Sequence, residues 1–337
     1  MKPKISIIIT IYNRERFIEE CARSLFEQTL DDIEYIFVDD ASTDNSIDIL
    51  HSLICSYPKR GSLIKIIHLE KNGGVSNARR IGMEQVSGEY VIHADSDDWV
   101  EKDMYERLYQ KAKETQADIV GCNICNEYLK KKSVLCQKYG NTIDENIRNL
   151  IRGDIHPSLC TSLTRLKLIT DNNIIFPDGL NMGEDLFYNL QLYLCARKII
   201  GMDFAPYHYR HTNESSSFHH TRQTIDSGIM IGRQIEKMMR MKNRYDEFAN
   251  DIEFRKFSLK LSLVYQFDNI EDYHYWLGIF PETHKNIWKY KQIDWKLRLE
   301  LWFAVHRMFT VSRIINKIIK WQHKIRRFLF VVIISLI

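Results

Sequence analysis

The chain has 337 residues, of which 45% are hydrophobic and 27% charged, and its formal net charge is +3. These values are typical of a globular protein and exclude a disordered one, and the length suffices for one large domain plus a second unit. The apolar run Ile5–Ile11 is short and has no cleavage site after it, which argues against a signal peptide and predicts a core strand.

The charge is unevenly distributed along the chain. No Asp or Glu follows Glu300, and the last segment carries seven of the 47 Lys and Arg residues. The other 40 face 44 acidic residues over positions 1–300, which gives that part a formal charge of −4. A mildly acidic body argues against general nucleic-acid binding, so we expect no nucleic acid among the partners.

The seven cysteines are scattered and odd in number, which is typical of reduced thiols and favours a cytoplasmic location. Cys122 and Cys125 have the CxxC spacing of some zinc and redox sites. No second pair of this kind and no histidine pair completes a zinc site, and the neighbouring residues alternate as in a strand. We therefore expect buried structural thiols here.

Short apolar runs alternate with helical patterns in the first half of the chain, which predicts an α/β fold with a mostly parallel central sheet flanked by helices. The expected strands are Ile5–Ile11, Ile33–Val38, Leu63–His68, Glu89–His93 and Asp118–Cys125. The expected helices are Glu15–Gln28, Asp44–Tyr57, Val75–Val86 and Lys102–Thr115.

The alternation stops near Asn141, mixed elements continue to Arg210, and the pattern beyond Thr221 is almost entirely helical. We therefore predict a nucleotide-binding and catalytic domain over residues 1–220. A helical extension over 221–300 and a basic tail over 301–337 follow it.

Polar clusters follow four successive predicted strands. Ligands of open α/β sheets bind beyond the carboxyl ends of the strands, so we expect these clusters to line one crevice. The clusters are Tyr12-Asn13, Asp39-Asp40, Asn72-Gly73-Gly74 and Asp95-Ser96-Asp97-Asp98.

The acidic clusters indicate two kinds of binding. Asp39 and Asp40 either make the side-chain hydrogen bonds of a turn and a helix cap or accept hydrogen bonds from a nucleobase. Two adjacent buried carboxylates need such partners, because burying a charge without one is costly. The three carboxylates of Asp95–Asp98 repel one another unless a cation lies among them, which favours Mg²⁺ or Mn²⁺ bridging to a diphosphate over a solvated turn.

Three further motifs complete the candidate site. Asn72–Arg80 places a helix start after two glycines, where a phosphate can approach, and Arg79 either contacts the ligand or pairs with the Asp clusters. Glu184 and Asp185 open a helical pattern, where acids are favoured in any case, and Asp185 is a candidate general base. Arg210 leads into a polar loop that could close over a diphosphate, or whose histidines could be surface residues.

Taken together and in this order, the motifs resemble those of family 2 of the inverting glycosyltransferases, which have the GT-A fold. The resemblance covers about residues 4–220. Thr10, Ala41 and Arg80 stand where the family most often has Pro, Gly and Asn, and none of these changes removes a group that the reaction needs. The stretches that carry the resemblance are Ser6–Asn13, Ser24–Thr29, Val38–Asp44, Asn72–Gly82, Asp95–Trp99 and Gly183–Asp185.

The resemblance implies a role for each of these residues. Tyr12 packs on the base, and Asp40 accepts a hydrogen bond from it. The donor-binding residues that it implies are Thr10, Tyr12, Asn13, Asp39, Asp40, Arg79, Asp95, Ser96 and Arg210.

The catalytic and metal-binding residues follow in the same way. Asp97, helped by Asp95, holds Mn²⁺ or Mg²⁺ on the diphosphate. Asp185 is the general base, and Glu184 orients it or the acceptor.

The implied reaction is transfer of a hexose or an N-acetylhexosamine from a nucleotide-sugar, most often a UDP-sugar in this family, to an acceptor hydroxyl with inversion. The acceptor would be a glycan or a lipid-linked saccharide in surface polysaccharide biosynthesis. The alternative is a catalytically inactive relative that serves as a scaffold subunit. Such a relative is expected to have lost Asp40, Asp97 or Asp185, and all three are present.

The tail has two faces at helical spacing, one basic and one apolar. Such a helix fits docking on an anionic membrane surface, peripheral on the inner face of the cell membrane, and the alternative is packing against protein. The final apolar stretch Phe328–Ile337 is too short to span a bilayer. The basic face comprises Arg313, Lys317, Lys320, Lys324 and Arg327, and the apolar face Ile314, Ile318, Trp321, Ile325 and Phe328.

Overall fold

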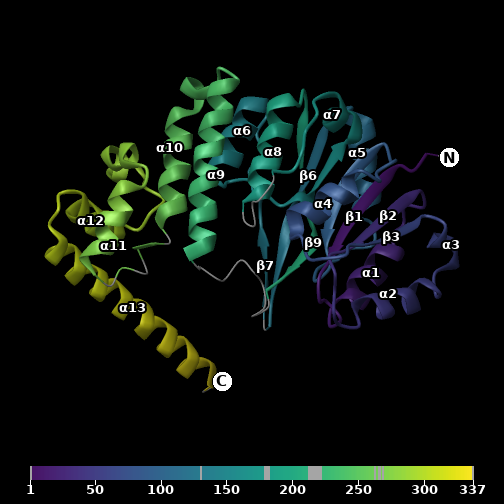
Figure 1. Cartoon of the computed structure of the whole chain (residues 1–337), viewed down its shortest axis with the longest axis horizontal. Coiled ribbons are helices and arrows are strands. Elements are labelled where there is room, and N and C mark those ends of the chain that lie inside the picture. Colours follow the sequence, from purple (N-terminus) through teal and green to yellow (C-terminus); the bar gives the residue numbers. More distant parts are fainter. Residues whose placement is uncertain are drawn as a thin grey trace. The chain divides into compact units, whose positions relative to one another are not determined.

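The computed structural model forms two compact units, residues 1–219 and 220–337. The residues that it describes are 2–129, 131–177, 183–211, 222–261, 263–264, 267 and 269–335. Figure 1 shows the elements of both units.

The first unit is built on one sheet. Its first four strands, β1 (Ile5–Ile11), β2 (Ile33–Asp39), β3 (Ile64–His68) and β4 (Tyr90–Asp95), lie parallel in the order β3-β2-β1-β4. Because β1 and β2 are covered on both faces, nearly every residue in them is buried and most are apolar. This part of the sheet is the parallel one that the sequence predicts.

Beyond β4 the sheet becomes mixed. β8 (Ser162–Arg165) lies antiparallel between β4 and β6 (Ile119–Tyr128), and β9 (Ile199–Arg210) runs parallel to β6. β5 (Trp99–Val100) and β7 (Lys131–Leu135) add short antiparallel pairings to β9 and β6. The sheet is therefore parallel around β1 and mixed at the other end.

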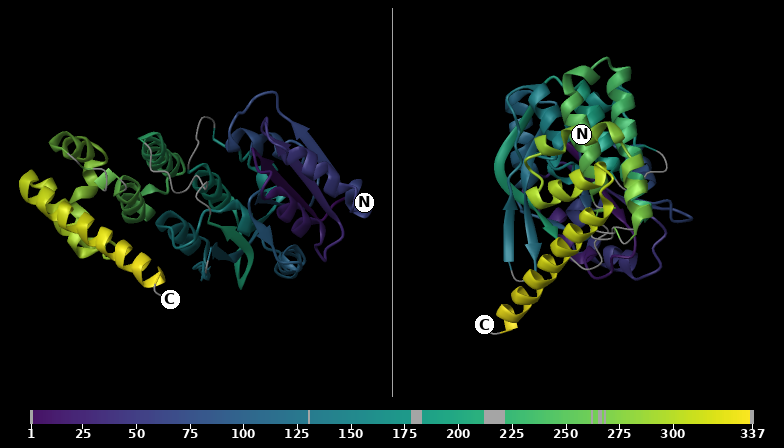
Figure 2. Two further views of the ribbon diagram at one scale, coloured as in Figure 1. Left: turned by 90° about the horizontal axis from the view of Figure 1, so that it is seen from below. Right: turned by 90° about the vertical axis from the view of Figure 1, so that its left-hand side faces the viewer.

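Helices cover both faces of the sheet (Figure 2). On one face, α1 buries Ile18, Cys21 and Leu25 at helical spacing against the odd-numbered isoleucines of β1. On the other, α4 approaches so closely that a Cβ at Gly82 would lie 2.5 Å from Cγ2 of Ile8. The helices of this unit are α1 (Ile18–Phe26), α2 (Ser46–Ile54), α3 (Pro58–Gly61), α4 (Val75–Met83), α5 (Met104–Thr115), α6 (Ile143–Arg152), α7 (Leu166–Asp171) and α8 (Glu184–Cys195).

The second unit is helical where the structure describes it, in agreement with the sequence pattern. Its core packs Phe257, Trp276, Ile287 and Leu301. No helix among the described residues is long and apolar enough to cross a membrane. Its elements are α9 (Arg222–Met241), α10 (Tyr245–Leu261), α11 (Ile270–Gly278), the 3₁₀ segment η4 (Pro281–Lys289), α12 (Trp295–Val305) and α13 (Phe309–Ser335).

Candidate active site

The sheet brings the predicted polar clusters to one edge. Thr10, next to the end of β1, is in register with Asp95 at the end of β4. Ile11 is in register with Asp39 at the end of β2, and Asp39 in turn with His68 on β3. The carboxyl ends of these four strands therefore form one continuous rim, as expected for a ligand crevice in an open α/β sheet.

Asp39 and Asp40 are buried and their carboxylates are used to shape the loops around them. Asp39 accepts a hydrogen bond from the backbone of Ser42 at 3.0 Å and lies 3.1 Å from Nδ1 of His68. Asp40 accepts hydrogen bonds from the backbone of Gly73 at 2.7 Å and of Gly74 at 2.8 Å. This carboxylate therefore pins the glycine turn before α4, while each of its oxygens keeps a second lone pair.

Two non-glycine residues at this rim adopt left-handed backbone conformations, Asn13 with φ 53° and Ala41 with φ 62°. The Asn13 side chain accepts a hydrogen bond from the backbone of Thr43 at 2.8 Å, which ties the loop after β1 to the loop after β2. Such outliers cluster at ligand sites because the surrounding structure holds them there. Ala41 lacks a polar side chain to compensate, and only glycine adopts such a positive φ without strain.

Tyr12 follows β1 and is 44% exposed. A large aromatic residue left open at the rim provides a flat surface for a ligand ring. Thr10 and Ser96 form the floor beside it, since the Ser96 hydroxyl donates to the carbonyl oxygen of Thr10 at 2.7 Å. Through this bond the loop after β4 is held against β1.

The three carboxylates after β4 have different surroundings. Asp98 is buried and accepts hydrogen bonds from the Tyr207 hydroxyl at 2.6 Å and the Arg210 backbone at 2.8 Å. The side chains of Asp95 and Asp97 keep 34% and 23% of their surface exposed. Burial and the adjacent Asp95 charge raise the pKa of Asp97. Asp95 and Asp97 are therefore available to a ligand, and Asp98 anchors the motif to β9.

Arg79 connects this motif to the start of α8. The residue is only 4% exposed, and its guanidinium donates to Asp95 Oδ1 and to Glu184 Oε1, each at 3.1 Å, and also to Asp185. A cation thus lies between the predicted metal motif and the predicted general base. Burial raises the pKa of Asp185, the Arg79 charge lowers it, and the Glu184 carboxylate raises it again.

Two further arginines lie near the same carboxylates. Arg14 Nε is 3.5 Å from Asp97 Oδ2. Arg210, at the end of β9, donates to Glu20 Oε2 at 2.6 Å and lies over the Phe17 ring at 5.2 Å. The loop that follows Arg210, predicted to close over the diphosphate, lies at residues 212–221, outside the described residues.

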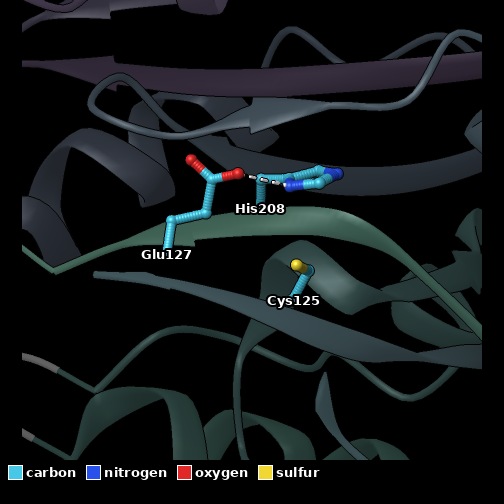
Figure 3. A group of neighbouring side chains, drawn as sticks. All are labelled: Cys125, Glu127 and His208. Carbon is cyan, nitrogen blue, oxygen red and sulfur yellow. Dashed lines mark hydrogen bonds and ion pairs between the residues drawn. The ribbon is translucent and has the colours of Figure 1, made fainter. Parts of the chain in front are cut away.

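A cluster on β6 and β9, formed by Cys125, Glu127 and His208, has ligand atoms within 4.8 Å of one another (Figure 3). Protein groups already neutralise it: Glu127 lies 2.9 Å from His208 Nδ1, 3.2 Å from Trp99 Nε1 and 2.5 Å from Lys132 Nζ. We interpret the cluster as a structural contact that holds β9 beside β5 and β6. Cys125 is buried, as expected of a structural thiol.

Sequence reasoning missed Arg14 and Glu20 as parts of this region, and it placed Tyr207 and His208 in the strand that leads to the polar loop without giving either a role. Arg14 follows Tyr12-Asn13 directly, so its place after a strand end was a usable signal. Glu20, Tyr207 and His208 carry no such signal, because only the packing of α1 and β9 brings them to the rim.

Polar clusters at the carboxyl ends of parallel strands, with two accessible carboxylates after β4, are the arrangement of a GT-A fold. The comparisons with known proteins agree. Residues 6–148 match the family model described as Glycosyl transferase family 2. EpsH of Bacillus subtilis is 30% identical over 258 residues, which make up 74% of this chain and 73% of EpsH. The chain therefore belongs to glycosyltransferase family 2 and is a glycosyltransferase.

Two kinds of solved structure share the fold. TarS residues 1–349 from S. aureus superimposes with a TM-score of 0.67 at 22% identity, over 95% of this chain and 92% of that one. Its complex with UDP-GlcNAc gives a TM-score of 0.64. The mannosyltransferase PcManGT from Pyrobaculum calidifontis, in complex with GDP-Man and Mn²⁺, gives 0.54 at 14% identity, over 94% and 84% of the two chains. The predicted GT-A fold with a helical C-terminal region is thus confirmed.

Proposed function

We propose that this glycosyltransferase moves a sugar from a UDP-sugar to an acceptor hydroxyl, with a divalent metal and with inversion at the anomeric carbon. The observation that carries the proposal is the Arg79 contact set. One buried guanidinium touches both Asp95 of the acidic motif and Asp185 at the start of α8. The group that holds the leaving diphosphate and the group that takes the acceptor proton therefore lie on either side of a single side chain.

The donor nucleotide is assigned to the rim formed by β1, β2 and α4. Tyr12 offers its open ring to the base, and the free lone pairs of Asp40 accept from base N–H groups, while Asp39 supports the turn beneath. Ser96, Thr10 and Asn13 hold the loops in place. The UDP-GlcNAc complex of TarS supports a UDP donor, since the fold is shared over nearly the whole chain.

The metal is assigned to Asp95 and Asp97. Their exposed oxygens fit a hard divalent cation, because Mg²⁺ and Mn²⁺ prefer carboxylate ligands. Burial and then the neighbouring Asp95 charge raise the pKa of Asp97, and a bound cation would offset both effects. When bound, the ion would stabilise the charge that develops on the leaving diphosphate. The Mn²⁺ complex of PcManGT supports this assignment.

The catalytic steps are assigned to α8. Asp185 takes the proton of the acceptor hydroxyl as the new glycosidic bond forms, and Glu184 orients Asp185 or the acceptor. The sugar is attacked on the face opposite the diphosphate, so the configuration inverts in one step without an enzyme-linked sugar. Arg210, whose guanidinium donates to Glu20 in this structure, is assigned to the leaving diphosphate, where it would make a charge-assisted contact.

The acceptor is assigned to surface glycan synthesis on the cytoplasmic side. All seven cysteines are unpaired, which suits a reducing compartment. The name of TarS, a poly(ribitol-phosphate) β-N-acetylglucosaminyltransferase that is 29% identical over 61% of this chain and 35% of its own length, supports a polymer acceptor and an N-acetylhexosamine or hexose as the transferred sugar. A lipid-linked saccharide is the other acceptor that this chemistry accommodates.

The first experiment is nucleotide release from UDP-, GDP- and dTDP-sugars with Mn²⁺, Mg²⁺ or EDTA. We expect slow, metal-dependent hydrolysis of a UDP-sugar that Asp97→Asn abolishes and Asp171→Asn, an exposed position on α7, does not. Nucleotide binding measured on the same panel covers the case in which turnover requires the acceptor. If neither hydrolysis nor metal-dependent nucleotide binding occurs, the protein is a scaffold relative and the proposal is wrong.

A further inference from the structure

Helix α13 is attached to the second unit by one of its faces. Ser312, Asn316 and Ile319 are buried there. The Asn316 amide donates to Glu300 Oε1 at 2.7 Å and to the Val264 carbonyl oxygen at 3.1 Å, and the Ser312 hydroxyl donates to the Glu300 carbonyl oxygen at 3.1 Å. The first part of α13 therefore has a defined orientation on its own unit.

The opposite face of the same helix is apolar and open. Ile314, Ile318 and Trp321 follow one another at positions i, i+4 and i+7, so they form one ridge along the helix. Their exposed fractions are 56%, 48% and 63%. At 100° per residue, this ridge points about 160° away from the mean direction of the buried face. It is therefore no part of the core of the second unit.

Cations border the ridge on one side. Arg313 and Lys317 lie next to it on the helix, and Lys317 is exposed. After Glu300 the sequence carries seven Lys and Arg residues and no Asp or Glu, so this segment is basic in composition. Lys320, which the sequence places on the solvated basic face, instead donates to the Phe267 carbonyl oxygen at 2.9 Å and so helps to fix the helix.

The helix continues past the ridge. In Figure 1, α13 extends beyond α11 and α12 of its own unit, and the right-hand view of Figure 2 shows the same extension. In the sequence, the spacing of the ridge continues at Ile325, Phe328 and Val332. An apolar stripe with a basic border along a single helix is typical of segments that lie in the plane of a membrane interface.

We infer that the Ile314–Ile318–Trp321 ridge docks on an anionic phospholipid surface. The ridge would lie among the upper acyl chains, and Arg313 and Lys317 would lie at the lipid phosphates. A second copy of the chain fits less well as the occupant, because two such ridges packed together would bring their basic borders close to each other. The inference rests on the proposed cytoplasmic location and extends it by naming the surface, and it does not depend on the donor chemistry.

The test is co-sedimentation of the full chain with phosphatidylcholine vesicles, with and without phosphatidylglycerol. We expect binding only to the anionic vesicles, with partition weakened about tenfold by Ile318→Glu or Trp321→Glu, because each change removes one inserted apolar side chain. Leu129→Glu is the matched control, since Leu129 is fully exposed on the first unit and the change adds the same charge. Lys317→Gln should weaken binding about fivefold at low salt and have little effect at high salt.

Several outcomes would overturn the inference. They are a wild-type chain that stays in the supernatant with anionic vesicles, Ile318→Glu and Leu129→Glu with equal partition, and a dimer in sedimentation velocity that Ile318→Glu dissolves without any lipid binding. The last result would assign the ridge to a second copy. Melting curves of the variants establish that they fold, and donor hydrolysis without vesicles should be unchanged. A failure of docking is thereby separable from a failure of the proposed enzymatic function.

Discussion

Replacing Arg79 with methionine removes a buried cation that contacts Asp95, Glu184 and Asp185, while it keeps much of the apolar stem. Loss of one member of a buried ionic network typically costs about 3–5 kcal/mol, because the remaining charges are left without a partner. Asp95 and Asp185 are partly exposed, with 34% and 25% of their side-chain surface accessible, so water relieves part of this cost. We therefore expect the lower end, about 3 kcal/mol.

Two measurements check this prediction. For a unit of this size, about 3 kcal/mol corresponds to a melting temperature lower by roughly 6–12 °C. The second readout is the pH profile of kcat/KM. Since Arg79 lowers the pKa of Asp185, its loss should raise that pKa, so the base stays protonated to a higher pH and the acidic limb of the profile moves upward.

Arg80→Met is the matched control, because Arg80 is the next residue on α4 but is exposed, and its guanidinium pairs with Glu84 and Asn77 on its own helix. That variant should change stability by less than about 0.5 kcal/mol. Arg79→Lys should give an intermediate effect, since it keeps the charge but not the three-way geometry. If Arg79→Met has the same melting temperature as Arg80→Met and the same pH profile as the wild type, the assigned role of Arg79 is wrong.

Three further substitutions separate chemistry from stability. Asp185→Asn should lower turnover by about 100-fold or more while donor affinity by calorimetry is unchanged, and normal turnover would remove Asp185 as the base. Glu300→Gln should stabilise the protein by about 2–3 kcal/mol at pH 8, and hardly at pH 5, in chemical denaturation. Burial raises the pKa of Glu300 to about 7. The wild type therefore loses stability as the pH rises from the ordinary pKa of a glutamate through 7, because the buried carboxyl must ionise. Equal effects of the substitution at both pH values would contradict this. Ala41→Gly should raise stability by about 1 kcal/mol because it relieves φ 62°, and a lower melting temperature would refute that.

The secondary structure of the first half could be predicted because it depends on local patterns. β1 spans Ile5–Ile11 as expected, and β2, β3, β4 and β6 lie where apolar runs occur. The helix ends differ by a few residues: α1, for example, begins at Ile18, three residues after the predicted Glu15. β5 was not expected, because two residues carry no period and are a strand only through pairing with β9.

The carboxylates show the limit of this reasoning within the site. Asp95, Asp97 and Asp98 cannot be told apart in the sequence. In the structure, however, the Tyr207 hydroxyl and the Arg210 backbone donate hydrogen bonds to Asp98, which gives that carboxylate a structural role. These partners lie more than 100 positions further along the chain, so no spacing rule could identify which acid remains available.

The sequence alone determined the order of the elements, the strand ends that carry polar residues and the family to which the chain is similar, because each depends on neighbouring residues and their periodicity. Only the tertiary structure decided that Arg79 joins Asp95 to Asp185 and that the ridge of α13 faces away from its own core. Both depend on packing between distant segments. Burial sets the strength of a charge and the exposure of an apolar face, and burial is a property of the fold rather than of any local pattern.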